Sequence, residues 1–240
     1  MATKPEWQYD EMKHCGVDYS DLAQVEVYDK RHQRFRDYQQ ETHAIIDRLA
    51  LGANDTVIDL GCGTGAFTLC AAKSCKKIYA VDVSKAMLDY CRQKAQKAKL
   101  DNIEFCQGGF LTYEHSGEPV EAIVSVAALH HLPDFWKMIA LRRLAAMLKP
   151  KGKLYLFDVV FSFDIADYQA CLDEWVKSTA EKVGPEFAEG AETHVRDEYS
   201  TFDWLMESLL EKAGFEIEKN DYKHDLLTTY LCTKTSKAEK

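Results

Sequence analysis

The stretch Val57-Ile58-Asp59-Leu60-Gly61-Cys62-Gly63-Thr64-Gly65 decides the fold of this chain. Its first part is a short β-branched and apolar run, which predicts a buried strand, and its second part has glycine at alternate positions. Residues 66–73 then continue as a predicted helix. A glycine-rich turn between a strand and a helix lets a ligand touch the backbone and leaves N–H groups pointing outward. We therefore expect a ligand site where this strand ends.

Further strands and helices alternate along the chain on both sides of this stretch. Strands are predicted at residues 77–81, 103–106, 121–126 and 153–160, and helices at 21–50, 84–99 and 134–148, with a turn at 150–152. Such alternation indicates an α/β fold, a parallel sheet with helices on both faces. The last two predicted strands, 215–219 and 226–233, are joined so closely that they must be antiparallel.

The segment between the fifth and sixth predicted strands departs from this alternation. Residues 164–183 are predicted to be helical, and Gly184-Pro185 ends that helix. Residues 186–200 are acidic and polar, with no predicted element, and residues 201–213 form a helix that Gly214 ends.

The composition of the chain argues against nucleic-acid binding and against a membrane-spanning protein. The 240 residues carry a net charge of −9, which disfavours nucleic-acid binding, and no apolar run has the roughly 18 residues of a membrane span. The polar N-terminus has no secretory core, so a cytoplasmic location is expected. None of the eight cysteines forms a Cys-x-x-Cys pair, and we expect them to be reduced, mostly buried side chains.

The glycine loop and two aspartates indicate which class of ligand this site binds. No Gly-Lys-Ser/Thr follows the loop, so it is not the phosphate loop of nucleotide hydrolases. Its Gly-x-Gly-x-Gly spacing differs from the dinucleotide pattern, although Ala66 could replace the third glycine of that pattern. Asp59 suits a ligand with an ammonium group better than a pyrophosphate. Asp82, at the end of the second strand, could accept hydrogen bonds from both hydroxyls of a ribose.

Four motifs in this order resemble those of class I S-adenosylmethionine-dependent methyltransferases. They lie at residues 57–65, 81–88, 122–132 and 148–154. The motifs also make the chain similar to the small-molecule methyltransferases of the ubiquinone/menaquinone-biosynthesis type. The resemblance implies a Rossmann-like, mostly parallel sheet of seven strands with an antiparallel C-terminal hairpin strand, and a helical cap or lid. It also implies the cofactor S-adenosylmethionine and the product S-adenosylhomocysteine.

The same resemblance assigns roles to the motif residues. Gly61, Cys62, Gly63 and Gly65 would surround the methionine part of the cofactor, and Asp59 would lie near its ammonium group. Asp82 would hold the ribose. The adenine would contact Val83, Met87, Gly109 and Phe110, and the methionine end would contact Val126, Ala127 and, from an N-terminal helix, Tyr28. Relatives often have Asp where Gly109 stands, so another group must meet the adenine amine here.

Two histidines directly after the fourth strand are the catalytic candidates. His131 and His130 lie near the expected position of the methyl group and could accept a proton from the acceptor. Methyl transfer from a sulfonium is an in-line displacement that needs positioning more than a covalent nucleophile. No metal site is predicted, because the pair lacks companion ligands at suitable spacing, and Ser125 and Val126 replace the acidic residues of magnesium-dependent relatives.

Four regions follow from the resemblance. Residues 1–50 would be an N-terminal helical cap, 51–160 the cofactor-binding core, 161–200 an acceptor lid, and 201–240 the helix and strand pair that complete the core. The lid offers apolar and polar candidates for the acceptor site, or for a small core of its own: Phe161, Phe163, Tyr168, Trp175, Phe187, His194, Arg196 and Tyr199.

The predicted function is methyl transfer from S-adenosylmethionine to a small-molecule acceptor. One alternative is a protein that binds this cofactor without catalysis. The other is an NAD-linked oxidoreductase, which would require glycine at Ala66 and an apolar residue at Asp59. The sequence leaves open the acceptor, the atom methylated, the use of a general base and the oligomeric state.

Overall fold

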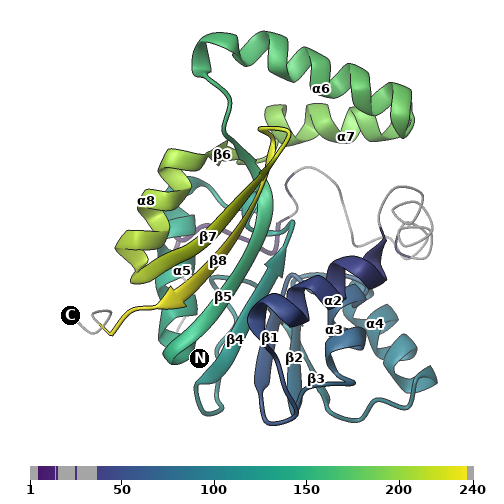
Figure 1. The fold of residues 1–240 in the computed structure, drawn as a ribbon. Coiled ribbons are helices and arrows are strands. Elements are labelled where there is room, and N and C mark those ends of the chain that lie inside the picture. Colours follow the sequence, from purple (N-terminus) through teal and green to yellow (C-terminus); the bar gives the residue numbers. More distant parts are fainter. Residues whose placement is uncertain (1–4, 14, 16–24, 26–36, 237–240) are drawn as a thin grey trace.

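The sheet of the computed structural model is built on parallel strands, as predicted (Figure 1). The model describes residues 5–13, 15, 25 and 37–236. The main sheet has the order β3-β2-β1-β4-β5-β8-β7, in which β8 runs antiparallel to both β5 and β7 and the other pairings are parallel. These strands are β1 (Thr56–Leu60), β2 (Lys77–Asp82), β3 (Ile103–Gln107), β4 (Val120–Val126), β5 (Leu148–Phe161), β7 (Phe215–Lys223) and β8 (Leu227–Lys234).

Helices cover both faces of this sheet. They are α2 (Tyr38–Leu49), α3 (Ala66–Ala71), α4 (Lys85–Lys97), α5 (Asp134–Met147), α6 (Tyr168–Lys182), α7 (Pro185–Arg196) and α8 (Asp203–Ala213), with single 3-10 turns at Leu129–His131 and Ile165–Asp167. Because side chains alternate along a strand, Ile123 packs with α5 and α8, whereas its neighbours Ala122 and Val124 pack with α2 and α3. The predicted class, an α/β fold with helices on both faces, is confirmed.

The expected end signals of two helices are confirmed. The Ser84 hydroxyl accepts a hydrogen bond from the backbone N–H of Met87, 3.2 Å away, and so caps the first turn of α4. Gly214, with φ 97°, ends α8.

Some boundaries differ from the prediction. Strand β5 begins at Leu148, five residues early, and passes through the predicted turn, where Lys151 has φ 63° beside a register shift in the pairing with β4. Strand β7 extends to Lys223 while β8 begins at Leu227, so that their connection shrinks to residues 224–226. The polar segment after Gly184 forms α7, because Ala188 and Ala191 bury one helical face. Strand β6 (Thr201–Phe202) adds a short eighth strand.

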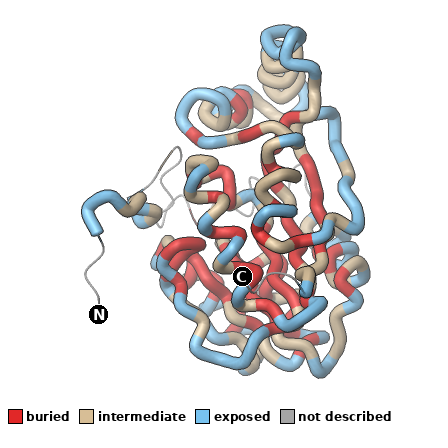
Figure 2. Tube along the Cα trace, turned by 90° about the vertical axis from the view of Figure 1, so that its left-hand side faces the viewer, coloured by how far each residue is buried: buried red, intermediate tan, exposed pale blue. Residues whose placement is uncertain are grey.

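The pair α6 and α7 stands beyond the end of β5 (Figure 1). Helix α6 has no buried residue, and this part of the chain is mostly tan and blue in Figure 2. The chain leaves the sheet at Phe161 and returns at Thr201, which pairs with Val160. The segment between them, residues 162–200, is an insertion whose two ends are therefore held side by side.

None of the helices in the described residues combines the length and apolar character required to cross a membrane.

Candidate active site

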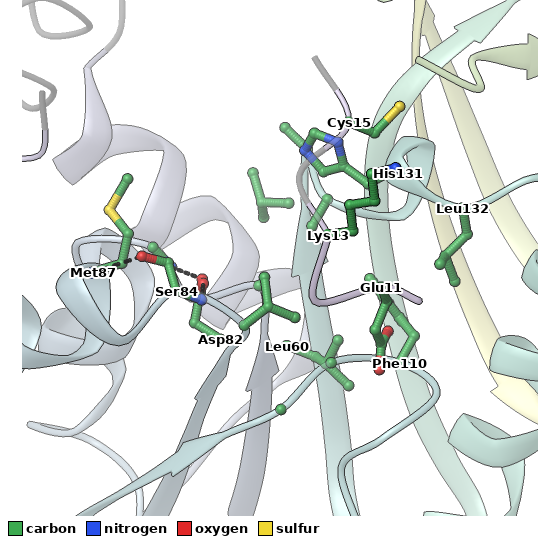
Figure 3. A pocket seen from close by; sticks show the side chains of 18 residues that line it. Glu11, Lys13, Cys15, Leu60, Asp82, Ser84, Met87, Phe110, His131 and Leu132 are labelled. Atoms are coloured by element: carbon green, nitrogen blue, oxygen red, sulfur yellow. Dashed lines mark hydrogen bonds between the residues drawn. The ribbon is translucent and has the colours of Figure 1, made fainter. Parts of the chain in front are cut away.

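A cavity lies at the carboxyl ends of β1, β2 and β4 (Figure 3). This is the edge where ligands of open α/β sheets bind, because the strand order reverses there. The cavity is lined by Glu11, Lys13, Cys15, Leu60, Gly61, Gly63, Asp82, Val83, Ser84, Met87, Gly108, Gly109, Phe110, Val126, Ala127, Ala128, His131 and Leu132. Nine of the thirteen predicted cofactor-binding residues are in this lining: Gly61, Gly63, Asp82, Val83, Met87, Gly109, Phe110, Val126 and Ala127.

The glycine loop needs glycine for two different reasons. Gly61 and Gly65 have φ values of 80° and 87°, and a Cβ atom would come within 2.4 Å of Ala128 Cβ at the first and 2.2 Å of Cys91 Sγ at the second. Gly63 has φ 52°, but nothing lies within 4 Å of where its Cβ would be. The backbone at Gly63 therefore faces open space in the cavity, which a ligand could occupy.

Asp82 connects this loop to the end of β2. Its Oδ2 accepts a hydrogen bond from the Gly63 N–H and its Oδ1 accepts one from the Ser84 N–H, both at 2.8 Å. The carboxylate thus orders two loops while it also lines the cavity.

Asp59, Cys62 and Gly65 lie outside the cavity lining. Asp59 is 3% exposed, and its Oδ2 accepts a hydrogen bond from the Thr68 hydroxyl at 2.5 Å. Burial raises the pKa of Asp59 to about 7, against the opposing effect of the Thr68 hydrogen bond. The expected contacts of these three residues with a ligand remain predictions. Tyr28, the other cofactor candidate, is outside the described residues.

Apolar side chains form two further walls. Val83 and Met87 lie on the β2 side, where the Ser84 cap places them, and Phe110 lies beyond the end of β3. Beside β4, Ala127 adopts φ 53°, an uncommon conformation for a residue other than glycine, and its N–H donates to Phe157 O at 2.7 Å. This sharp turn directs the chain from β4 into His130 and His131.

The N-terminal segment supplies a wall that the sequence analysis missed. The Glu11 carboxylate accepts hydrogen bonds from the Leu111 N–H, at 2.9 and 3.0 Å, and from the Thr112 hydroxyl at 2.6 Å. A Cβ at Gly109 would lie 2.5 Å from Glu11 Oε2. Glu11 thus occupies the space that an aspartate at position 109 would take. No local pattern in the sequence signals a contact between residues about 100 positions apart.

The two catalytic candidates have different surroundings. His131 lines the cavity, whereas His130 is 4% exposed and lies outside the lining. His130 Nδ1 lies 2.5 Å from Asp158 Oδ1, and Asp158 Oδ2 accepts hydrogen bonds from the N–H groups of Leu129 and His130 at 2.8 and 3.1 Å. Asp158 therefore fixes both the ring of His130 and the backbone that carries it.

A buried carboxylate from the insertion meets both histidines. Glu198 Oε2 lies 3.4 Å from His130 Nε2, and Glu198 Oε1 lies 3.9 Å from His131 Nδ1. Glu198 Oε2 also contacts His194 Nδ1, without the alignment of a hydrogen bond. Glu198 comes from a segment about 65 residues away, so spacing along the sequence could not reveal that it lies beside the histidine pair. The expectation that there is no metal site remains a prediction.

The charges of this cluster are coupled. Burial and the neighbouring His130 lower the pKa of His131 to about 4, so its ring is neutral near pH 7. Burial would also lower the pKa of His130, but Asp158 and Glu198 outweigh that effect and raise it. Burial would raise the pKa of Glu198, but His194 and His130 outweigh it and lower that pKa.

The other lid candidates lie apart from the cavity lining. The rings of Phe161, Phe163 and Trp175 pack on one another, with centroids 5.2 and 6.1 Å from that of Phe161. Trp175 also stacks on His194, at 6.2 Å. Tyr168, Phe187, Arg196 and Tyr199 do not line the cavity either.

Comparison with known proteins agrees with this geometry. A family model for a methyltransferase domain matches residues 57–152. An uncharacterized methyltransferase of Geobacillus kaustophilus is 29% identical over 206 residues, which cover 83% of this chain and 90% of that protein. The methyltransferase-domain match and this relative support a class I S-adenosylmethionine-dependent methyltransferase.

Solved structures show the same fold. A methyltransferase that depends on S-adenosylmethionine, from Clostridium acetobutylicum, has a TM-score of 0.67 at 14% identity, covering 88% of this chain and 98% of that one. Magnesium protoporphyrin IX methyltransferase of Synechocystis, solved with bound S-adenosylhomocysteine, has a TM-score of 0.60 at 16% identity, covering 92% and 90%. The predicted fold is confirmed, and the methyltransferase relatives support the predicted family and its cofactor, S-adenosylmethionine.

Proposed function

We propose that this methyltransferase transfers a methyl group from S-adenosylmethionine to a small-molecule acceptor by in-line displacement. The observation that carries the proposal is the cavity at the strand ends, where the open face of Gly63 and the carboxylate of Asp82 lie together. The cofactor supplies an activated methyl group. The chain supplies the position and the surroundings of the reacting atoms.

The cavity fits the parts of the cofactor in order. Gly61 and Gly63 would border its methionine part, and Asp82 would accept hydrogen bonds from the ribose hydroxyls. Val83, Met87 and Phe110 offer apolar contact for the adenine. We assign the adenine amine to Glu11, because its carboxylate lies where the aspartate of relatives would reach. Asp59 would order the glycine loop through its hydrogen bond with Thr68.

The acceptor would approach from the side of His131. Among the described residues, His131 is the one histidine in the cavity lining, and it follows the turn at Ala127 that borders the expected methionine end. His130 would act through its neighbours, because it is buried behind the lining. The α6–α7 pair and Glu198 lie beyond the same edge, which supports residues 161–200 as the acceptor lid.

Binding and turnover test this proposal separately. Isothermal titration with S-adenosylhomocysteine should show micromolar binding, and the same titration with NAD should show none. Incubation with labelled S-adenosylmethionine and a panel of hydroxyl, thiol, amine and acidic-carbon acceptors should then label one class. Binding without transfer to any acceptor would favour a non-catalytic binding protein, and binding of NAD alone would refute the proposal.

The variant His131→Gln separates chemistry from cofactor binding. We expect a lower kcat with an unchanged Kd for S-adenosylhomocysteine, since the imidazole would act on the acceptor and not on the cofactor. The exposed His43 on α2 provides a matched control as His43→Gln. An unchanged kcat across pH for His131→Gln would remove His131 from the reaction.

A further inference from the structure

Beside the cavity, three side chains present metal-ligating atoms to one another. One ring nitrogen each of His130 and His131 and one carboxylate oxygen of Glu198 lie within 4.8 Å of one another. They come from two places in the chain, the 3-10 turn after β4 and the segment just after α7, which the fold brings together. A set of two imidazoles and one carboxylate is a common ligand set for a catalytic zinc ion.

The spacing of these atoms suits a tetrahedral ion. Ligand atoms at the usual 2.0–2.2 Å from zinc are separated from each other by about 3.3–3.5 Å. Glu198 Oε2 lies 3.4 Å from His130 Nε2, and its other oxygen, Oε1, lies 3.9 Å from His131 Nδ1. Binding would draw the three ligand atoms together from separations of at most 4.8 Å.

Asp158 provides independent support from the other side of His130. A histidine that binds a metal usually donates its second ring N–H to a carboxylate, which orients the ring. His130 Nδ1 has this partner in Asp158, at 2.5 Å. The Nε2 atom is thereby directed at Glu198, whose Oε2 lies 3.4 Å away.

Glu198 adds a second sign that a positive group belongs here. It is 8% exposed, and its Oε2 contacts His194 Nδ1 and lies 3.4 Å from His130 Nε2. Burying the charges of Glu198 and Asp158 in one cluster is costly unless cations balance them. A divalent ion bound to Glu198 would provide that balance.

We propose that His130, His131 and Glu198 bind a divalent transition-metal ion, with Zn²⁺ as the best fit. Imidazole ligands disfavour Mg²⁺ and Ca²⁺, which take oxygen ligands. Three protein ligands leave a fourth position open, and His131 places the site next to the cavity. His194, in contact with Glu198 Oε2, and Asp158 would position the ligands.

The role of the ion, unlike the site itself, rests on the proposed function. An acceptor thiol or hydroxyl could take the open position and release its proton to water. The bound oxygen or sulfur would then hold an electron pair ready for the methyl carbon. The acceptor would accordingly be a thiol or a hydroxyl compound, and not an amine or a carbon acid.

Metal titration of the full chain tests the site directly. After dialysis against a chelator, Zn²⁺ would be titrated in competition with a chromophoric chelator, with one ion bound per chain expected. Glu198→Gln and His131→Asn should each weaken binding at least tenfold. Glu192→Gln on the exposed face of α7 and His43→Asn on α2 should leave it unchanged. His131→Asn keeps the test valid if Glu198→Gln fails to fold, because the His131 side chain is 31% exposed.

Cobalt distinguishes this site from the eight free cysteines of the chain. Co²⁺ in the proposed site should show tetrahedral visible bands without thiolate charge transfer, and both ligand variants should abolish these bands. Binding that is absent, or that survives both variants, would overturn the metal site. S-adenosylhomocysteine titration in parallel separates the two proposals: if it binds while zinc does not, the proposed function stands and His131 remains as a proton acceptor.

Discussion

The Oδ2 atom of Asp82 accepts a hydrogen bond from the Gly63 N–H at 2.8 Å, and this contact joins the end of β2 to the glycine loop after β1. The other oxygen accepts the Ser84 N–H, at the first turn of α4. One carboxylate therefore shapes both sides of the cavity in which we expect the ribose to bind.

The variant Asp82→Ala should weaken binding of S-adenosylhomocysteine. Losing hydrogen bonds to an ionised group costs about 1–3 kcal/mol, which corresponds to about a 5- to 150-fold higher Kd. Isothermal titration measures this change, and Asp101→Ala, at an exposed position before β3, is the control. An unchanged Kd would remove Asp82 from the ribose site.

Two glycine variants should separate stability from binding. Gly65→Ala should lower the free energy of unfolding by about 2–5 kcal/mol, because φ 87° strains alanine and the new methyl group meets Cys91 Sγ. Gly63→Ala should cost only about 1–2 kcal/mol, because its methyl group enters open space. That methyl group should instead weaken binding of S-adenosylhomocysteine. Urea unfolding and titration of both variants check this contrast, and equal stability losses would contradict it.

The pH dependence of stability should reveal Asp59. Its pKa is about 7 in the folded chain and near 3.8 when unfolded, so the folded state holds an extra proton between these values. Stability from this group is therefore present at low pH and is lost as pH rises toward 7. Asparagine cannot ionise, so the Tm of Asp59→Asn relative to that of the unmodified chain should increase from pH 5 to pH 8. Parallel Tm curves would show that Asp59 is ionised throughout.

The variant Lys151→Gly should stabilise the chain slightly. A left-handed conformation costs a residue other than glycine about 1–2 kcal/mol, and the greater freedom of unfolded glycine cancels about 0.5–1 kcal/mol of the gain. Lys151 has φ 63° and is exposed, so little packing is lost. We expect an increase of up to about 1 kcal/mol in urea unfolding. Lys149→Gly, at a position without positive φ, should give a decrease.

The parallel sheet could be predicted because its signals are local. The run from Val57 to Leu60 and the glycines after it define a strand and a turn without information from the rest of the chain. Ser84 and Gly214 are helix-end residues whose chemistry acts within one turn. Residues that follow parallel strands lie together at the carboxyl edge of the sheet. For this reason nine of the predicted cofactor-binding residues line the cavity.

The rest of the site depends on contacts between distant segments. Glu11 meets Leu111, and Glu198 meets His130, through contacts that no spacing along the chain predicts. Helix α7 did leave a signal, since Ala188, Ala191 and Val195 recur at helical spacing, but acidic residues and Gly190 obscure it. The turn at Lys151 was recognised, although pairing with β4 and β8 extends the strand around it.

The parallel pairing of Val160 with Thr201 brings both ends of residues 162–200 to one point at the rim of the sheet. A segment anchored in this way can be exchanged between homologous enzymes without altering the register of the strands below it. A chimera that carries the corresponding segment of a relative should keep the cofactor of this chain and acquire the acceptor preference of the donor. The ligand at position 198 would travel with the exchanged segment, while the two histidines would stay with the core. Acceptor choice would thus change with the exchange of one segment whose two ends meet at one place in the fold.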